Sequence, residues 1–311
     1  MPAHALPDLR AIEAAAERIA PYAYRTPVMR SRSLDELAGA ELHFKCEHLQ
    51  RVGAFKFRGA CNAVWSLDEA EALRGVVTHS SGNHGAALAL AARTRGIPAH
   101  VVVPEGAVRS KVAAIEAYGA TLHRCAPTIA AREDAAERVR RETGAAFVHP
   151  YTDPRVIAGQ GTAALELVRE VDHLDALIAP IGGGGLIGGS ALVARALAPH
   201  AAVFAAEPSG AADAYESLRR GSRVTDTVPD TICDGLRATI GEINLELLEA
   251  CAVRVFTVAD ADTLAAQRLI AARLKQVVEP SSAIALAAVL AHRDAFAGRR
   301  VGIILSGGNV D

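Results

Sequence analysis

The sequence places a lysine between two phenylalanines where a glycine gives way to a helix-like run: Lys56 stands between Phe55 and Phe57 in GAFKFRGACNAV. Aromatic neighbours can hold an amine away from water, and desolvation lowers its pKa toward the neutral, nucleophilic form. Alternatively, a lysine at a helix start lays its stem on aromatic surface while its ammonium group reaches solvent. This stretch by itself favours the second interpretation and leaves the first open.

Two glycine-bearing turns follow expected strands and open expected helices, SSGNHG at 80–85 and GGGGLIGG at 182–189. In an open parallel sheet, ligands bind beyond the carboxyl ends of the strands. A helix N-terminus preceded by glycines offers unpaired N–H groups to a phosphate, so the second turn suits a phosphate. The first turn gathers two hydroxyls, an amide and an imidazole around Gly82, which suits a small carboxylate: Ser80, Ser81, Asn83 and His84.

The second turn also satisfies a dinucleotide-binding pattern. Gly183, Gly185 and Gly188 match G-x-G-x-x-G, and Glu207 ends the next strand, roughly where that pattern has its ribose-binding acid. An NAD-dependent dehydrogenase is therefore an alternative. A third turn, ILSGGNVD, places Ser306 at the end of the last expected strand. Sites for a phosphate, a carboxylate, an amine and one further polar partner fit pyridoxal phosphate (PLP) far better than a dinucleotide.

The elements that must position these residues alternate along the chain. Strands are expected at 75–79, 99–104, 120–125, 174–181, 202–208, 253–258 and 300–306, with helices at 84–95, 108–118, 128–143, 155–170, 186–198, 260–273 and 281–293. Near-continuous apolar strands separated by helices indicate parallel sheets covered on both faces. We expect two α/β domains with a cleft between them: residues 71–152 form a small domain, and 1–70 with 153–311 form a large one.

Composition indicates a soluble protein of enzyme size. Of 311 residues, 50% are hydrophobic and 22% charged, and the net charge is −2, so no electrostatic footprint for nucleic acid or an acidic membrane is visible. We see no signal peptide and no apolar run that approaches a membrane span. The odd number of widely spaced cysteines indicates reduced thiols in a cytoplasmic protein: Cys46, Cys61, Cys125, Cys233 and Cys251.

Five motifs together, GAFKFRGA, SSGNHGAALA, VIAGQGT, GGGGLIGG and SGGNVD, resemble those of the fold-type II PLP enzymes. This is the α/β fold of tryptophan synthase β, with two mostly parallel domains and the active site in the cleft between them. The resemblance is closest to serine/threonine dehydratases and serine racemase, and it runs from Thr26 to Asp311. It implies that Lys56 is the Schiff-base lysine.

The resemblance also assigns roles to the other residues. It implies that Lys56 shuttles the α-proton, and that Ser81 handles a proton on the opposite face of the cofactor. Phe55 and Asn83 are expected at the pyridine ring or its 3-hydroxyl, and Ser306 at the pyridine nitrogen. The phosphate is expected at Gly182, Gly183, Gly184 and Gly185, and the substrate carboxylate at Ser80, Ser81, Asn83 and His84.

Within the family, the resemblance favours an ammonia-lyase (dehydratase) that converts L-threonine or L-serine to a 2-oxo acid and ammonia. Tyr151, in HPYTDP, favours a dehydratase over a racemase, but Ser81 is the group that a racemase also requires, so serine racemase activity is an alternative. Arg132, in PTIAARED, matches a position that can pair with a distal carboxylate, which keeps L-threo-3-hydroxyaspartate as a further alternative substrate.

The segment AAEPSGAADAYES resembles a metal-binding segment of the same branch. It implies that Glu207, the carbonyl of Ala211 and Asp213 bind magnesium, calcium or manganese through oxygen. Glu207 and Asp213 can also be a pair of acids at a helix start. The family further suggests a homodimer. Because the sequence stops at the last expected strand, we expect no C-terminal regulatory domain and no feedback control by isoleucine.

Overall fold

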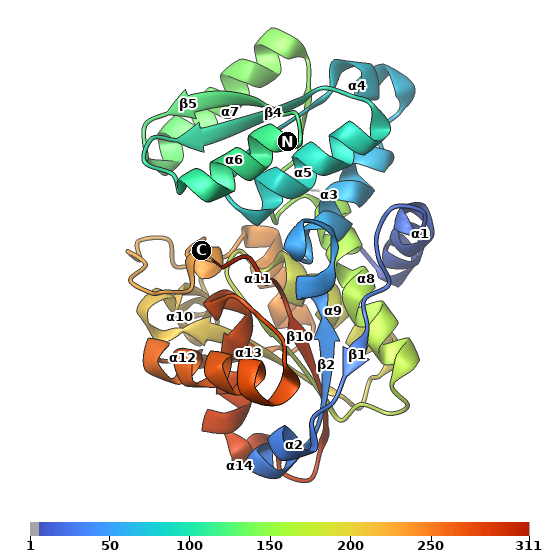
Figure 1. The fold of residues 1–311 in the computed structure, drawn as a ribbon, viewed down its shortest axis with the longest axis vertical. Helices are drawn as coiled ribbons and strands as arrows, with labels where there is room; N and C mark the ends of the chain where they lie inside the picture. Colours follow the sequence, from blue (N-terminus) through green and yellow to red (C-terminus); the bar gives the residue numbers. More distant parts are fainter. Residues whose placement is uncertain (1–5, 311) are drawn as a thin grey trace.

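The computed structural model describes residues 6–310 and shows two α/β units, one above the other in Figure 1. Residues 1–5, at the start of the segment in which we see no signal peptide, and Asp311, at the end of the SGGNVD motif, lie outside the described part. The expected α/β fold with mostly parallel sheets is confirmed: one sheet has six strands and the other four.

The larger sheet has the strand order β1-β2-β10-β7-β8-β9. Only the short β1 pairs antiparallel, with β2, and every other neighbouring pair is parallel. The strands are β1 Val28–Met29, β2 Glu41–Cys46, β7 Ala176–Pro180, β8 Ala202–Pro208, β9 Arg254–Val258 and β10 Arg300–Leu305. The arrowhead of β2 points toward the smaller unit in Figure 1, so the carboxyl ends of the parallel strands face it.

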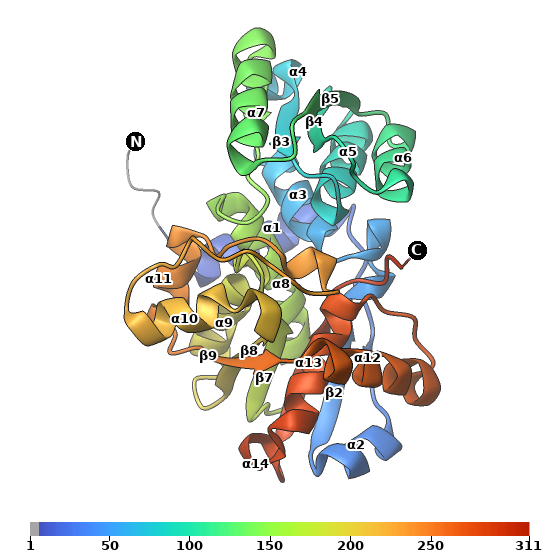
Figure 2. The ribbon, with the colours of Figure 1, turned by 90° about the vertical axis from the view of Figure 1, so that its left-hand side faces the viewer.

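The smaller sheet has the order β5-β4-β3-β6 and is parallel throughout. Its strands are β3 Val76–His79, β4 Ala99–Pro104, β5 Thr121–Cys125 and β6 Ala146–Phe147. Figure 2 shows one helix, α7, on one side of this sheet and two, α5 and α6, on the other. The buried clusters agree: Ala135 and Ala136 of α7 pack on one face of β4, and Ala86 and Ala89 of α5 pack on the other.

Helices cover both faces of the larger sheet, with α12 and α13 on one side and α8 and α9 on the other (Figure 1). The helices of this unit are α1 Leu9–Ile19, α2 Arg32–Ala38, α8 Pro154–Glu170, α9 Gly185–Leu197, α10 Asp213–Arg220, α11 Glu242–Ala250, α12 Asp260–Leu269, α13 Pro280–Ala291 and α14 Arg293–Phe296. The helix α3 Lys56–Trp65 lies between the units and packs against both α8 and α5. The helices of the smaller unit are α4 Glu69–Arg74, α5 Asn83–Arg95, α6 Arg109–Ala117 and α7 Ile129–Thr143. Among residues 6–310, no helix is both long and apolar enough to span a membrane.

The strand β2 was not predicted, although it lies inside the larger sheet next to β10. Its sequence, ELHFKC, alternates polar and apolar residues, which is typical of a half-exposed strand. Here two of the three polar positions, His43 and Lys45, are buried. Lys45 Nζ donates hydrogen bonds of 2.6 Å to the Thr26 carbonyl and to a carboxylate oxygen of Glu166 on α8. Partners distant in sequence therefore make this strand an interior one.

Candidate active site

Lys56 is the first residue of α3, at the junction of the two units in Figure 1. Its Nζ donates a hydrogen bond of 3.0 Å to the carbonyl oxygen of Pro150 and lies 5.1 Å from the centre of the Phe55 ring. Burial lowers the pKa of Lys56 to about 8, and the charge of Glu279 opposes that change. Lys56 is half-buried, so the structure supports the interpretation in which its amine is partly withdrawn from water.

The residues before Lys56 are fixed to the turn that follows the last strand. Ala54 forms an antiparallel bridge with Gly307, and the N–H of Phe55 donates to the carbonyl oxygen of Ser306 at 2.9 Å. Ser306 is buried directly after β10. The structure therefore brings Ser306 to two other predicted cofactor residues, Phe55 and Lys56, although Ser306 follows Lys56 by 250 positions in the chain.

The glycine turn 182–185 follows β7 and leads into α9, which begins at Gly185. Gly184 has a φ of +93°, a conformation that favours glycine. A Cβ atom on Gly183 would lie 2.3 Å from the ring of Tyr151, and one on Gly184 would lie 2.7 Å from the Cβ of Asn244. No side chain of the described residues caps α9, so its first N–H groups form the kind of site that binds a phosphate.

The SSGNH turn follows β3, and α5 begins at Asn83. The Asn83 side chain points into the larger unit: its Nδ2 donates to both carboxylate oxygens of Glu279 at 3.2 Å, and its Oδ1 accepts from Asn309 Nδ2 at 2.9 Å. A Cβ atom on Gly82 would meet nothing within 4 Å, so space remains beside this turn. The turn therefore lies over the cofactor residues, with Ser80 and Ser81 at its start.

His84 is buried in the first turn of α5. Burial lowers its pKa well below the ordinary value of 6.5, and the charge of Lys56 adds to that effect. The imidazole is therefore neutral at physiological pH, so it can offer a substrate carboxylate a hydrogen bond but no charge.

Glu279 was not selected from the sequence, yet it lies among the site residues. It is 4% exposed, contacts Asn83 and Gly307, and directly precedes α13. Burial raises its pKa to about 7, while the hydrogen bond from Asn83 acts in the opposite direction. The signal in the sequence was an acid placed immediately before a proline in an otherwise apolar stretch, VVEPSSAIAL.

The HPYTDP segment forms the wall on the side of the glycine turn. His149 Nδ1 accepts hydrogen bonds from the N–H groups of Tyr151 and Thr152, at 3.3 and 3.0 Å. Burial lowers the pKa of His149 to about 3, with further contributions from His79 and Lys56. This histidine is thus a neutral acceptor that shapes the segment, and the Tyr151 ring packs against the glycine turn.

Arg132 lies in the first turn of α7, whose N-terminus is capped by Thr128. Its Nε is buried without a hydrogen-bond partner among the described residues. Burial lowers the pKa of His79, the last residue of β3, and the positive charge of Arg132 contributes to that change. The charge of Arg132 therefore acts on the residue that directly precedes the predicted substrate turn.

The predicted metal residues lie elsewhere in the larger unit. Glu207, at the end of β8, accepts hydrogen bonds of 2.8 Å from the N–H groups of Ala214 and Tyr215 at the start of α10. Asp213 accepts from the N–H of Ile240 at 2.7 Å. Burial raises the pKa of Glu207 to about 8 and raises that of Asp213. Residues 6–310 contain no cluster of three His, Cys, Asp or Glu side chains suited to a metal, so Ala211 would have to supply a carbonyl.

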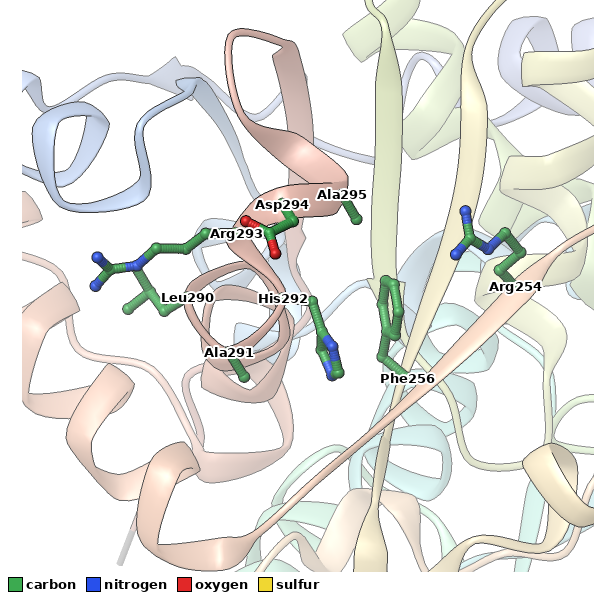
Figure 3. A pocket seen from close by; sticks show the side chains of 8 residues that line it. All are labelled: Arg254, Phe256, Leu290, Ala291, His292, Arg293, Asp294 and Ala295. Atoms are coloured by element: carbon green, nitrogen blue, oxygen red, sulfur yellow. The ribbon is translucent and has the colours of Figure 1, made fainter.

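A cavity of about 550 Å³ lies away from these residues, between β9 and the junction of α13 and α14 (Figure 3). The His292 ring stacks on Phe256 with centroids 4.1 Å apart. The cavity is lined by Arg254, Phe256, Leu290, Ala291, His292, Arg293, Asp294 and Ala295, none of which was predicted as a site residue.

The sequence matches the pyridoxal-phosphate dependent enzyme family over residues 19–307. The chain belongs to this family. It is 49% identical to a β-hydroxyaspartate dehydratase of Paracoccus denitrificans over 98% of this chain and 97% of that protein, and 48% identical to a serine racemase of Arabidopsis thaliana over 98% and 93%. The structure superimposes on that of maize serine racemase with a TM-score of 0.96 and 46% identity, covering 98% of this chain and 94% of the other.

Membership of the family confirms the resemblance found in the sequence and supports PLP as the cofactor. It argues against the NAD-dependent dehydrogenase considered for the GGGGLIGG turn. The geometry agrees, because Glu207, the acid that would bind a ribose in that alternative, instead accepts hydrogen bonds from the start of α10. The similarity to a hydroxyaspartate dehydratase and to a serine racemase supports the two alternatives, hydroxyaspartate ammonia-lyase and serine racemase, better than the dehydration of L-threonine or L-serine.

Proposed function

We propose that the protein is a PLP-dependent ammonia-lyase whose preferred substrate is L-threo-3-hydroxyaspartate. The observation that carries this proposal is Arg132, whose buried Nε lacks a partner among residues 6–310 beside the turn expected to bind the substrate's α-carboxylate. A second carboxylate on the substrate would give this guanidinium a charged acceptor. The likeness to a β-hydroxyaspartate dehydratase over nearly the whole length of both chains supports the same substrate.

The residues present fit PLP. The uncapped start of α9 offers N–H groups for its phosphate, the half-buried Lys56 lies next to the aromatic ring of Phe55, and Ser306 offers a hydroxyl. Bound PLP supplies an electron sink for the charge that develops at the α-carbon. When PLP is bound, the Ser306 hydroxyl would bind the pyridine nitrogen. The amide of Asn83, already oriented by Glu279, would lie at the 3-hydroxyl.

In this proposal Lys56 removes the α-proton of the substrate as a general base. A pKa of about 8, set mainly by burial, leaves a substantial share of the amine neutral near neutral pH. The N–H groups and hydroxyls of the SSGNH turn bind the α-carboxylate, and the neutral His84 adds a hydrogen bond without adding charge. Arg132 orients the distal carboxylate and thereby fixes the β-hydroxyl for elimination. The hydroxyl leaves as water, with a proton that balances the one removed from the α-carbon, and water then converts the released enamine to a 2-oxo acid and ammonia.

The divalent cation is part of the same proposal. Glu207 and Asp213 are buried, and burial raises the pKa of both carboxyl groups. A bound cation would lower these pKa values because it favours the ionised carboxylates. Each Glu207 oxygen accepts one N–H and keeps a further lone pair for a metal. Magnesium, calcium or manganese would bind these oxygens and the Ala211 carbonyl, and would stabilise the folded protein by mass action.

A second candidate function is serine racemase. It is supported by the 48% identity to the Arabidopsis enzyme and by Ser81, which lies in the turn over the cofactor residues. The homodimer and the cytoplasmic location suggested by the sequence stay predictions. Light scattering of the purified protein would measure the oligomer.

The test is a substrate comparison with purified protein. L-threo-3-hydroxyaspartate, L-threonine and L-serine are supplied separately, and 2-oxo acids and the D-enantiomer are measured. We expect the highest kcat/KM for hydroxyaspartate. Arg132→Met should lower that value about ten- to a hundredfold and leave L-threonine turnover nearly unchanged, since one charged contact is lost. Arg138→Met, on the exposed side of α7, is the matched control. A preference for threonine, or an equal loss on every substrate, would contradict the proposal.

A further inference from the structure

We propose that Asn244 is a positioning residue that fixes the phosphate-binding turn and the segment contacted by Lys56 in one geometry. Asn244 lies in the first turn of α11 and is fully buried. It belongs to neither of the segments it joins and to none of the motifs selected from the sequence. The proposal rests on the PLP site of the proposed function, but not on which amino acid is the substrate.

A single amide group connects the two segments. Asn244 Nδ2 donates a short hydrogen bond to the carbonyl oxygen of Gly183 and another, of 2.9 Å, to that of Tyr151. The residue before Tyr151 is Pro150, whose carbonyl oxygen accepts the hydrogen bond from Lys56 Nζ. Asn244 therefore binds Gly183 in the phosphate turn through one amide hydrogen and Tyr151 through the other. Tyr151 directly follows Pro150, the residue that accepts the hydrogen bond from Lys56.

The contact with Gly183 also determines where the next N–H group points. The peptide between Gly183 and Gly184 is trans, so its C=O and N–H point in opposite directions. The Gly183 carbonyl faces α11, where it accepts from Asn244 and from the N–H of Gly241 at 3.2 Å. The N–H of Gly184 is therefore directed away from α11, toward the side on which the start of α9 is free to bind a phosphate.

The orientation of the amide is fixed by its partners. Both are carbonyl oxygens, so only the nitrogen of the Asn244 side chain can face them. Its Oδ1 is buried and has no partner among the described residues. A buried acceptor without a partner lowers the stability of the fold. We infer that this loss is accepted because the amide must present two donor hydrogens at this point. An aspartate of the same shape would place oxygen against oxygen and a negative charge beside the phosphate site.

The experiment compares Asn244→Leu and Asn244→Asp with the wild type, in the full-length protein. PLP release from the holoenzyme after dilution and PLP binding to the cofactor-depleted chain give the dissociation constant. The ³¹P chemical shift of the bound phosphate reports its hydrogen-bonding directly. We expect PLP to bind roughly ten- to a hundredfold more weakly in the Leu variant, which loses two hydrogen bonds, and more weakly still in the Asp variant. The ³¹P signal should move in both.

Asn62→Leu is the matched control, because Asn62 is also a buried amide that donates to a main-chain carbonyl, that of Arg155, at 2.7 Å. It should lower the melting temperature but leave PLP affinity and the ³¹P shift unchanged. If the Leu and Asp variants do not fold, Asn244→Ala is judged by the same titration. Wild-type affinity with an unmoved ³¹P signal in a folded Asn244 variant would overturn the proposal. No substrate is used, so this outcome is independent of the substrate assignment.

Discussion

The two acids near α10 predict an unusual response of stability to pH. Burial raises the pKa of Glu207 from its ordinary value of 4.5 to about 8, although two N–H groups donate to it. Between these pH values the folded protein keeps the proton, whereas the unfolded chain has released it. The folded state therefore binds more protons, and the free energy of unfolding must fall as pH rises from about 4.5 to about 8 when no cation is bound.

The size of the effect follows from the same two values. Each pH unit over which the proton is retained is worth about 1.4 kcal/mol, so the whole interval corresponds to at most about 5 kcal/mol. Between about pH 6 and 8 the loss is roughly 2–3 kcal/mol, or about 5 °C in melting temperature for a chain of this length. A divalent cation bound to Glu207 and Asp213 would favour the ionised carboxylates and remove the slope.

The assay is thermal and urea unfolding at pH 6, 7 and 8, with EDTA and with magnesium. With EDTA we expect stability to fall with pH. With magnesium at pH 8 we expect the melting temperature to recover, because a ligand that binds only the folded state stabilises it by mass action.

Glu207→Gln is the control that isolates this carboxyl. Burial also raises the pKa of Glu279, to about 7, and so adds a slope of the same sign. The difference between wild type and Glu207→Gln removes that background, and magnesium should not stabilise the variant. If the difference in stability between EDTA-treated wild type and Glu207→Gln is the same at pH 6 and 8, and magnesium does not stabilise the wild type, the N–H groups alone keep Glu207 ionised and the prediction is refuted.

Three further predictions concern the active site. Lys56→Ala should abolish covalent attachment of PLP and the absorption band that accompanies it, and borohydride reduction followed by mass spectrometry would check this; retained attachment would exclude Lys56 as the anchoring residue. Ser81→Ala should lower racemisation of L-serine and any reaction of D-serine about a hundredfold or more, with a smaller loss of elimination from L-substrates. Chiral analysis of the products measures both activities. An equal loss of both would mean that Ser81 only positions the substrate. Glu279→Gln should lower the pH at which cofactor-depleted protein begins to react with PLP, because the Glu279 charge raises the pKa of Lys56; an unchanged pH profile would mean that the two groups do not interact.

The sequence was informative where a structural role is local. Apolar runs at 99–104 and 300–306 predicted the interior strands β4 and β10, and the glycines after 174–181 predicted the turn that leads into α9, whose role in phosphate binding stays a prediction. The strand β2 was missed because its interior position depends on Glu166, which is 121 residues from Lys45 in the chain. A polar residue in a strand pattern predicts a solvent-exposed position unless its partner, distant in the sequence, is known.

The same reasoning explains which site residues were missed. Lys56 has a local signal in its two aromatic neighbours. Glu279 and Asn309 act on Asn83 from 196 and 226 residues away, and Asn244 reaches Gly183 across 61. Isolated acids and amides of this kind occur throughout any soluble protein. Their roles arise only when the fold brings them to a turn that the sequence had already marked.

The two units contribute to the site through contacts of different character. On the larger unit's side, Arg58, two residues after Lys56 in α3, is buried and binds Glu47 and Glu166 through hydrogen bonds of 2.7 to 2.8 Å. Removing one member would leave a buried charge unpaired, which is strongly destabilising, so this network holds the start of α3 rigidly.

The smaller unit, by contrast, contacts the larger unit through the amide of Asn83, in the SSGNH turn, and through an ion pair between Lys111 on α6 and Asp234, whose side chain is 42% exposed. Solvent-exposed ion pairs contribute little to stability, so the Lys111–Asp234 pair costs less to break than the network around Arg58. Of the residues assigned to the cofactor, Phe55, Lys56, the glycine turn and Ser306 lie on the firmly held side of the cleft, whereas Asn83 and the residues assigned to the substrate carboxylates lie on the smaller unit. This division lets the turn adjust to a substrate without disturbing the lysine.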